Sequence, residues 1–429
     1  MRPEPERLLK AANAQTGDKV RVTTGDGASF EGLLMPSHAF SQPDIVTLKL
    51  GTGYNVGIKV DARAKMEKVA ASPPRAAVPK RSFAPDPNKP TIAVLGTGGT
   101  IASFVEYRTG AVYPAKSADE LISSVPELTD LANVRAKVVY EVFSEDLVPD
   151  NWRHLAREVA AALNDGARGV VIPHGTDTLG FTAAALSFML RDLTGPVVLV
   201  GAQRSSDRPS SDAALNLLSS ARLAAQGDLG EVVVCMHRES SDTNAAIHRG
   251  AKVRKNHSSR RDAFESVNVP PIGSVAKDQV VLDQPHAPRA KGPVKVDDRL
   301  EENVGLLYTY PGLSPEELLR ERKRKGLVLA GTGLGHASRR LLGALQELTR
   351  GGTTVVMTTQ CLWGRVNMNV YSTGRDQLAA GVLSGEDLLP ETAYVKLMHV
   401  LGTAKSRDEV PRLWYANEAG EFALETRFA

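Results

Sequence analysis

Three short stretches of the sequence carry side chains that could act together in proton-transfer chemistry. Residues 91–103, TIAVLGTGGTIAS, run from an apolar strand through a glycine-rich turn to the hydroxyl of Thr100. Residues 169–178, GVVIPHGTDT, repeat this order and deliver Thr176 and Asp177. A hydroxyl is a weak nucleophile until a neighbouring base removes its proton. Two threonines and a carboxylate at equivalent strand ends therefore call for a base elsewhere in the chain.

The third stretch supplies a candidate for that base. Residues 251–264, AKVRKNHSSRRDAF, place Lys255 among three arginines. Neighbouring cations favour the neutral form of an amine by like-charge repulsion. A neutral lysine that is hydrogen-bonded to Thr176 and Asp177 can take a proton from water or from a hydroxyl.

The same stretches also have a structural interpretation. Thr and Asp after a turn are common helix N-caps, so Asp177 or Thr178 can simply open the helix that follows. The glycines at 96, 98 and 99 do not follow the G-x-G-x-x-G spacing of a phosphate-binding loop. The catalytic interpretation depends on the repetition of one pattern at two strand ends.

The surrounding elements predict where the three stretches meet. From residue 91 onward, continuous apolar strands such as GVVIPHG and PVVLVG alternate with helical runs such as TLGFTAAALSFMLRDL. This alternation predicts an α/β fold with a mostly parallel sheet that helices cover on both faces. Because ligands bind at the carboxyl ends of such strands, we expect the site at that edge.

Composition divides the 429 residues into four parts. Residues 1–70 contain short alternating runs between turn residues, which predict a small all-β barrel with a structural or docking role. Residues 71–90 hold six prolines and predict a semi-extended linker. Residues 91–285 form the larger α/β domain, and residues 300–429 form a smaller α/β domain. Near residue 268 the alternation of strands and helices lapses, and residues 266–298 are irregular and proline-bearing.

Charge, apolar runs and cysteine content bear on the partners and the cellular location of the protein. The net charge of +3 neither implies nor excludes contact with nucleic acid. The first residues carry charges where a signal peptide needs an apolar core, and no apolar run approaches the roughly eighteen residues of a membrane span. We therefore expect a cytoplasmic protein without membrane contact. Cys235 and Cys361 lie in apolar runs, and we expect two buried thiols rather than a disulfide or metal site.

Several motifs in order resemble the L-asparaginase family. TGGTIAS, HGTDT and VRKNHSSRRDAF are similar to the three active-site motifs of that family. The resemblance continues through FSEDLVPDNW, SVNVPPIGSV and the segment from TTQCLWGRVNMNVYSTGRDQLAAGV to PETAYVKLMHVLG, and covers roughly residues 91–405. It implies a two-domain asparaginase-like fold, here preceded by the small β domain.

The resemblance implies catalytic roles for four residues. Thr100 matches the first catalytic threonine of the family, Thr176 and Asp177 match the threonine–aspartate pair, and Lys255 matches the lysine. Lys252, three residues earlier, is a competing match for the lysine. Because VRKNHSSRRDAF aligns without a gap, Lys255 is the preferred match.

Three further residues match substrate-binding positions of the family. Tyr113 matches the flap tyrosine, which would orient or deprotonate Thr100, although Tyr107 lies nearby. Ser144 and Glu145 match the pair that receives the α-carboxylate and α-ammonium groups of the substrate. The resemblance implies no metal site.

Within the family, the N-terminal β domain, the linker and the run NMNVYSTGRDQLAAGV resemble the D subunits of archaeal tRNA-dependent amidotransferases. This likeness implies a glutaminase component of a carbon–nitrogen ligase. It would release ammonia from glutamine or asparagine, so that a partner, the E subunit of the amidotransferase, converts Glu-tRNA(Gln) to Gln-tRNA(Gln) with ATP.

The same likeness implies a heterotetramer built on a homodimer of this chain, with charged tRNA bound through the complex. It implies no cofactor in this chain, with ATP and Mg bound by the partner. Two alternatives stay open: a stand-alone cytoplasmic L-asparaginase with an accessory β domain, and a binding protein on a decayed asparaginase scaffold.

Overall fold

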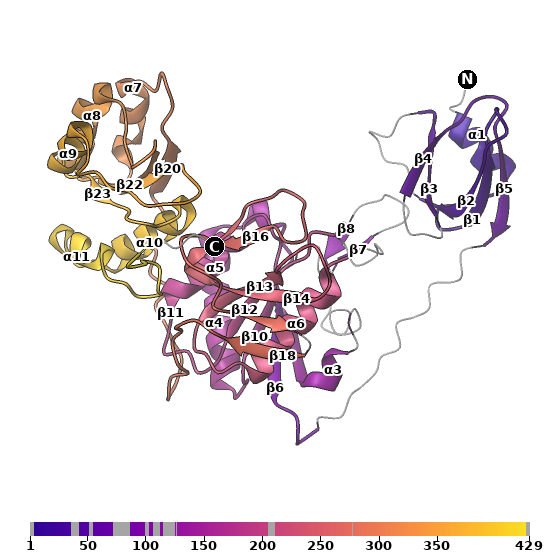
Figure 1. Cartoon of the computed structure of the whole chain (residues 1–429), viewed down its shortest axis with the longest axis horizontal. Coiled ribbons are helices and arrows are strands. Elements are labelled where there is room, and N and C mark those ends of the chain that lie inside the picture. Colours follow the sequence, from indigo (N-terminus) through magenta and orange to yellow (C-terminus); the bar gives the residue numbers. More distant parts are fainter. Residues whose placement is uncertain are drawn as a thin grey trace.

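A computed structural model of the chain describes most of its 429 residues. The described residues are 4–35, 43–50, 55–71, 86–98, 103–105, 112–114, 125, 127–204, 211–276 and 278–425. Thr100 and most of the predicted linker lie outside these ranges. Figure 1 shows the elements coloured along the sequence, with the N-terminal module in indigo, the larger domain in magenta to orange and the smaller domain in orange to yellow.

The N-terminal module is a small antiparallel sheet with one helix. Its elements are α1 (Glu4–Ala11), β1 (Lys19–Thr23), β2 (Ser29–Leu34), β3 (Ile45–Leu50), β4 (Asn55–Lys59) and β5 (Lys65–Ala70). Val20 and Val22 of β1 are buried between exposed neighbours, because successive side chains of a strand point to opposite faces. The hydrogen-bonded order runs β4-β3-β2-β1-β5, so closure into the expected barrel stays a prediction.

The larger domain contains an eight-stranded sheet in the order β18-β17-β14-β13-β12-β10-β6-β9. Five adjoining strands are parallel: β6 (Thr91–Gly96), β9 (Asn133–Val138), β10 (Val170–Pro173), β12 (Val197–Val200) and β13 (Val232–His237). Every residue of β10, β12 and β13 is buried, as expected of strands covered on both faces. The predicted α/β fold with a mostly parallel sheet is confirmed.

Three antiparallel strands complete this sheet at one edge: β14 (Asn244–Arg249), β17 (Gly273–Ala276) and β18 (Gln279–Leu282). The prediction of irregular structure over residues 266–298 is wrong where β17 and β18 lie. Each of these two strands has only four residues, with side chains that alternate in burial. So short an alternation between prolines gives too weak a pattern to predict a strand.

Helices cover both faces of the parallel strands. α4 (Pro149–Asn164) and α5 (Leu179–Met189) pack on one face, while α3 (Leu128–Leu131) and α6 (Ala213–Gln226) lie on the other. α4 is amphipathic, whereas α5 is apolar and almost wholly buried. The reason is that α10 (Pro390–Thr403) of the smaller domain covers the outer surface of α5.

Short ladders and turns lie around the large sheet. The two-stranded ladders pair β7 (Ser103–Val105) with β8 (Val112–Pro114), β11 (Leu190–Arg191) with β19 (Lys295–Val296), and β15 (Val253–Lys255) with β16 (Phe264–Ser266). The 3-10 turns are η2 (Ser144–Asp146) and η3 (Gly250–Lys252).

The smaller domain is a parallel four-stranded sheet with helices. Its strands are β20 (Val304–Tyr308), β21 (Gly326–Gly331), β22 (Thr354–Thr359) and β23 (Leu383–Ser384). Its other elements are α7 (Pro315–Leu318), η4 (Leu319–Lys323), η5 (Arg339–Leu341), α8 (Leu342–Arg350), α9 (Ser372–Ala379), α10, η6 (Arg407–Glu409) and α11 (Val410–Trp414). α10 packs on β21 as well as on α5, so one helix joins both domains.

The two cysteines differ in environment. Cys235 lies inside β13 and is buried, as expected. Cys361 is exposed, and the expectation of a buried thiol there is wrong. It follows β22 rather than lying in it, because the buried strand ends at Thr359, two residues before the cysteine.

A buried histidine should make the stability of the larger domain depend on pH. His248 on β14 has its Nδ1 2.8 Å from Ser266 Oγ, and burial, reinforced by the charge of Arg238, lowers its pKa to about 4. In the unfolded chain the imidazole pKa is about 6.5. The unfolded state therefore binds more protons between these values, and stability is present above about pH 6.5 and is lost as pH falls toward 4.

The variant His248→Gln should accordingly lose part of this pH dependence. Between pH 6.5 and 4.5, the free energy of unfolding should fall less steeply with decreasing pH than in the wild type. The difference between the two slopes should be about 1 kcal/mol per pH unit. Denaturant unfolding at several pH values measures this slope. Parallel curves for His248→Gln and wild type would show that His248 is not the group responsible.

Candidate active site

The second and third motifs meet at the carboxyl edge of the large sheet. Lys255, the last residue of β15, donates from Nζ to Thr176 Oγ1 at 2.9 Å and to Asp177 Oδ1 at 2.7 Å. The side chain of Lys255 is 13% exposed, and that of Asp177 is 68% exposed. The ammonium group thus lies between a buried hydroxyl and a solvent-exposed carboxylate.

The turn that carries Thr176 follows β10 and leads into α5. Thr178 occupies the N-cap position of α5 but makes no side-chain capping bond. Its hydroxyl donates instead to the carbonyl oxygen of Ser144 at 2.7 Å. Since Asp177 binds Lys255, neither side chain does what the helix-cap interpretation requires.

His174 fixes the same turn through a buried hydrogen-bond chain. Its Nε2 lies 2.9 Å from Thr182 Oγ1, and Trp152 Nε1 donates to that hydroxyl at 3.1 Å. The hydroxyl therefore donates to Nε2, which leaves Nδ1–H to donate to the carbonyl oxygen of Gly175 at 2.7 Å. Complete burial lowers the His174 pKa to about 4, so the ring is neutral and fixes the backbone just before Thr176.

The first motif adjoins the second through its leading residues. Thr97 is buried, and its Oγ1 donates to the carbonyl oxygen of Pro173 at 2.8 Å. Gly98 has a φ of +94°, and a Cβ there would lie 2.6 Å from the carbonyl oxygen of Val142. Only glycine fits this approach. Thr100 follows two residues later, outside the described residues, and its role stays a prediction.

The predicted substrate-binding residues lie at different depths. Ser144 is buried in η2 and is joined to the Thr176 turn by the bond from Thr178. Glu145, the next residue, is exposed. The backbone of Tyr113 pairs with that of Phe104 in the β7–β8 ladder, and its side chain is outside the described part of the structure. The substrate-binding roles of all three stay predictions.

The three arginines near Lys255 are each paired with a carboxylate. The pairs are Arg254–Glu391, Arg260–Asp262 and Arg261–Asp242. The crowding of positive charge that the sequence suggested is therefore offset by acidic partners. The charged group bonded to Lys255 itself is the carboxylate of Asp177.

Lys252, the competing match, lies elsewhere. It is 1% exposed, and its Nζ donates to Asp387 Oδ2 at 2.6 Å and to the carbonyl oxygen of Asp387 at 3.2 Å. Asp387 belongs to the smaller domain and lies just before α10. Of the two lysines, Lys255 contacts Thr176, and Lys252 forms a buried interdomain ion pair.

Sequence reasoning missed a polar network beside these residues. It contains Asp212, Asn216, His237 and Asp242, none of which belongs to the three motifs. The available signal was the position of Asp242, shortly after a buried strand at the carboxyl edge of the sheet.

Clusters of metal-binding side chains and membrane-spanning helices are both absent from the described residues. Within the ranges given above, no group of three or more His, Cys, Asp or Glu side chains is placed to hold a metal ion. Among the helices of those ranges, none combines the length and apolarity that crossing a bilayer requires.

Family models match three segments of the chain. Residues 14–69 match the GatD N-terminal domain, residues 91–288 match the N-terminal domain of asparaginase, and residues 303–414 match the glutaminase/asparaginase C-terminal domain. The motifs that contain Thr176 and Lys255, which contact each other, both fall within the second segment.

Solved structures with this fold include two asparaginases. The thermostable L-asparaginase from Thermococcus kodakarensis superposes with a TM-score of 0.70 at 35% identity, covering 78% of this chain and 99% of that one. L-asparaginase I from Vibrio cholerae gives a TM-score of 0.69 at 32% identity, covering 78% and 100%.

Relatives of known name match over nearly the whole length. The chain is 49% identical over 430 residues to the D subunit of glutamyl-tRNA(Gln) amidotransferase from Pyrococcus furiosus, covering 98% of both chains. It is 48% identical over 441 residues to the same subunit from Thermococcus kodakarensis, covering 100% of this chain and 99% of the relative. With all three segments matched as well, the chain belongs to the D-subunit family of glutamyl-tRNA(Gln) amidotransferases, which is built on the asparaginase fold.

Proposed function

We propose that this chain is the glutaminase component of a tRNA-dependent amidotransferase. It hydrolyses the side-chain amide of glutamine, or of asparagine, and releases ammonia for transfer to Glu-tRNA(Gln). The observation that carries the proposal is the contact of Lys255 with both Thr176 and Asp177. The names of the full-length relatives support the tRNA-dependent reaction rather than free amide hydrolysis.

In the proposed reaction, Thr100 or a water molecule attacks the amide carbon of the substrate. Thr176, Asp177 and Lys255 handle the protons: they accept one from the attacking oxygen and return one to the departing nitrogen. Backbone N–H groups of the glycine-rich turn stabilise the oxyanion. The balance is amide plus water giving carboxylic acid plus ammonia, which is equivalent to carboxylate, a released proton and ammonia, whether or not an ester of Thr100 forms on the way.

The exposure of Asp177 suits this scheme. The side chain of Lys255 is mostly shielded from solvent, whereas that of Asp177 is largely exposed. The carboxylate holds Nζ of Lys255 against Thr176, so proton exchange with the hydroxyl needs no movement of the lysine. Ser144, Glu145 and Tyr113 are proposed to bind the α-groups of the substrate and to close over it.

The proposed assembly pairs this chain with a partner that binds charged tRNA. The relatives are named as one subunit of an amidotransferase, which indicates a complex with at least one partner subunit. We propose the E subunit of the amidotransferase as the partner, in a cytoplasmic heterotetramer built on a homodimer of this chain. ATP and Mg are proposed to bind the partner, where they would activate the glutamyl ester.

The rival function is that of a stand-alone asparaginase. It is favoured by the superposition of solved asparaginases on 78% of this chain. The N-terminal segment, which matches the GatD N-terminal domain, speaks against it.

Ammonia release with and without the partner distinguishes the two functions. The purified chain should hydrolyse glutamine slowly, and the rate should rise about tenfold or more when the E subunit and Glu-tRNA(Gln) are added. Gln-tRNA(Gln) should form only in the complete mixture with ATP. Brisk asparagine hydrolysis by the chain alone, with no response to the partner, would support the rival. Thr176→Val serves as the inactive control for both assays.

A further inference from the structure

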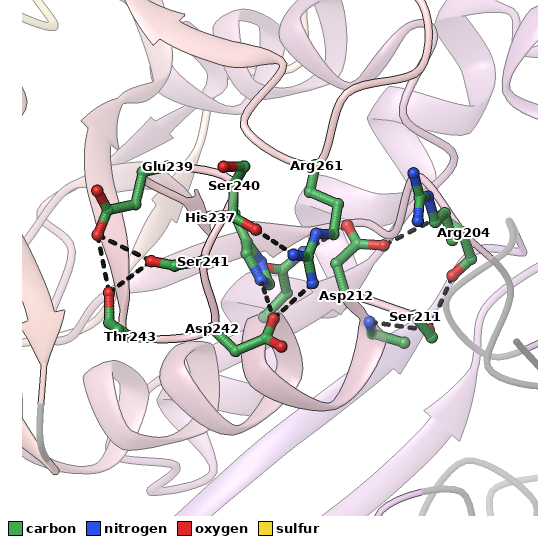
Figure 2. Close-up of polar contacts among 12 residues, drawn as sticks. Arg204, Ser211, Asp212, His237, Glu239, Ser240, Ser241, Asp242, Thr243 and Arg261 are labelled. Atoms are coloured by element: carbon green, nitrogen blue, oxygen red, sulfur yellow. Dashed lines mark hydrogen bonds and ion pairs between the residues drawn. The ribbon is translucent and has the colours of Figure 1, made fainter. Parts of the chain in front are cut away.

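A hydrogen-bonded network beside the site centres on the carboxylate of Asp242, in the loop between β13 and β14. Figure 2 shows this carboxylate between His237 and Arg261. Asp242 Oδ1 lies 2.6 Å from Arg261 Nη1 and 3.0 Å from His237 Nε2. The contact with His237 and the charge of Arg261 lower the pKa of Asp242, so the group is ionised at neutral pH.

Arg261 connects this carboxylate to the hairpin that carries Lys255. It lies in the loop between β15 and β16, where Lys255 pairs with Phe264 and the N–H of Asn256 donates to the carbonyl oxygen of Ala263 at 2.7 Å. The loop is therefore closed directly after Lys255. Arg261 ties that loop to the β13–β14 loop through Asp242, and a second bond runs to the carbonyl oxygen of Ser240.

His237 connects the same carboxylate to the end of β12. The ring is completely buried, and its Nδ1 lies 2.6 Å from Asn216 Oδ1 on α6. Asn216 Nδ2 donates to the carbonyl oxygen of Gly201 and to Asp212 Oδ2, each at 3.0 Å.

The end of β12 in turn borders Thr176. A Cβ on Gly201 would lie 2.5 Å from Thr176 Cγ2, so only glycine permits this approach. Asp212 holds the residues that follow, because its carboxylate accepts from the N–H groups of Gln203 and Arg204 at 3.0 to 3.1 Å. Hydrogen bonds thus run without a break from the Lys255 loop to the backbone against Thr176.

We propose that Asp242 is a positioning residue that sets where the Lys255 ammonium lies relative to Thr176 and Asp177. The inference rests on the proposed function, in which these three residues handle protons. Their contacts of 2.9 and 2.7 Å leave little tolerance, and a misplacement of about 1 Å can cost about 10²-fold in rate. Asp242 acts through Arg261 and His237 and does not contact Lys255 in this arrangement.

The same loop supplies a matched control. Glu239 Oε1 accepts from Ser241 Oγ at 3.0 Å and from Thr243 Oγ1 at 2.8 Å. Figure 2 shows these bonds on the far side of the loop from Arg261. Glu239 therefore shapes the loop internally, whereas Asp242 joins it to two other elements.

The test compares Asp242→Asn, Arg261→Gln, the double variant and Glu239→Gln in the complete complex. Asp242→Asn should lower kcat for glutamine hydrolysis by about 10- to 100-fold and change KM by less than about twofold. Arg261→Gln should have a similar effect, and the double variant should be no slower than the slower single variant, because both break one linkage. Glu239→Gln should keep the wild-type kcat.

The outcomes separate this inference from the proposed function. Wild-type kcat in Asp242→Asn or in Arg261→Gln, with Thr176→Val inactive, overturns the positioning role and leaves the proposed function standing. Full additivity in the double variant also overturns it. If Asp242→Asn fails to fold, Arg261→Gln decides alone, because it breaks the same linkage and leaves the contact of Asp242 with His237 in place. Activity in Thr176→Val would instead defeat the proposed function itself.

Discussion

Replacing Lys255 with methionine should lower kcat for glutamine hydrolysis by about 10³-fold while leaving the protein folded. Methionine keeps much of the length and the apolar stem of the side chain but removes the amine that contacts Thr176 and Asp177. In the proposed reaction, the Thr176 hydroxyl then has no amine with which to exchange its proton. Asp177 is largely exposed, so it loses its partner without becoming a buried, unpaired charge.

A second substitution separates proton transfer from positive charge. Lys255→Arg keeps a cation, but a guanidinium group cannot lose its proton in a protein. We expect this variant to be about as inactive as Lys255→Met, as measured by ammonia release with saturating glutamine. The exposed Lys295→Met is the control and should be fully active. Near-wild-type activity in Lys255→Arg would mean that the lysine supplies charge alone.

Replacing Lys252 with methionine should instead destabilise the fold, by about 3 to 5 kcal/mol in free energy of unfolding. This lysine pairs with Asp387 in the junction between the two α/β domains, and both side chains are buried. Removing the cation leaves a buried carboxylate whose other partner is the N–H of Ala423. The cost of an unpaired buried charge is the physical reason for so large an effect.

Denaturant unfolding measures this loss, and an apolar pair provides its control. In the double variant Lys252→Met, Asp387→Leu, no charge is left unpaired, so much of the stability should return. A loss below about 1 kcal/mol in Lys252→Met would show that the junction does not depend on this ion pair. The two lysine variants together are expected to distinguish a residue that the proposed reaction requires from one that the fold requires.

The local pattern of the sequence was enough to predict the α/β fold. Strands such as β10 and β12 are apolar throughout because both faces are covered, and that composition is visible without coordinates. The position of Thr176 and Asp177 after β10 follows from the same local pattern. It places them at the carboxyl edge, which is the edge at which Lys255 meets them.

Features that depend on distant contacts could not be predicted. Strands β17 and β18 are too short for their pattern to be recognised, and they form because β14 offers them an edge. The arginines near Lys255 suggested a source of repulsion, yet each has an acidic partner from another part of the fold or from its own loop. The sequence around Asp242 did not predict its contacts with Arg261 and His237, since Arg261 lies 19 residues away along the chain.

The sequence by itself determined the strand-and-helix order of the two α/β domains and the strand end that carries Thr176 and Asp177. The family resemblance favoured Lys255 over Lys252, but no contact distinguished the two lysines, because they lie three residues apart in one cationic stretch. Only the tertiary structure separated them, since their partners are 135 and 79 residues distant along the chain. Burial against Asp387 makes one lysine part of the domain junction, and the short reach across the sheet edge to Thr176 makes the other part of the site.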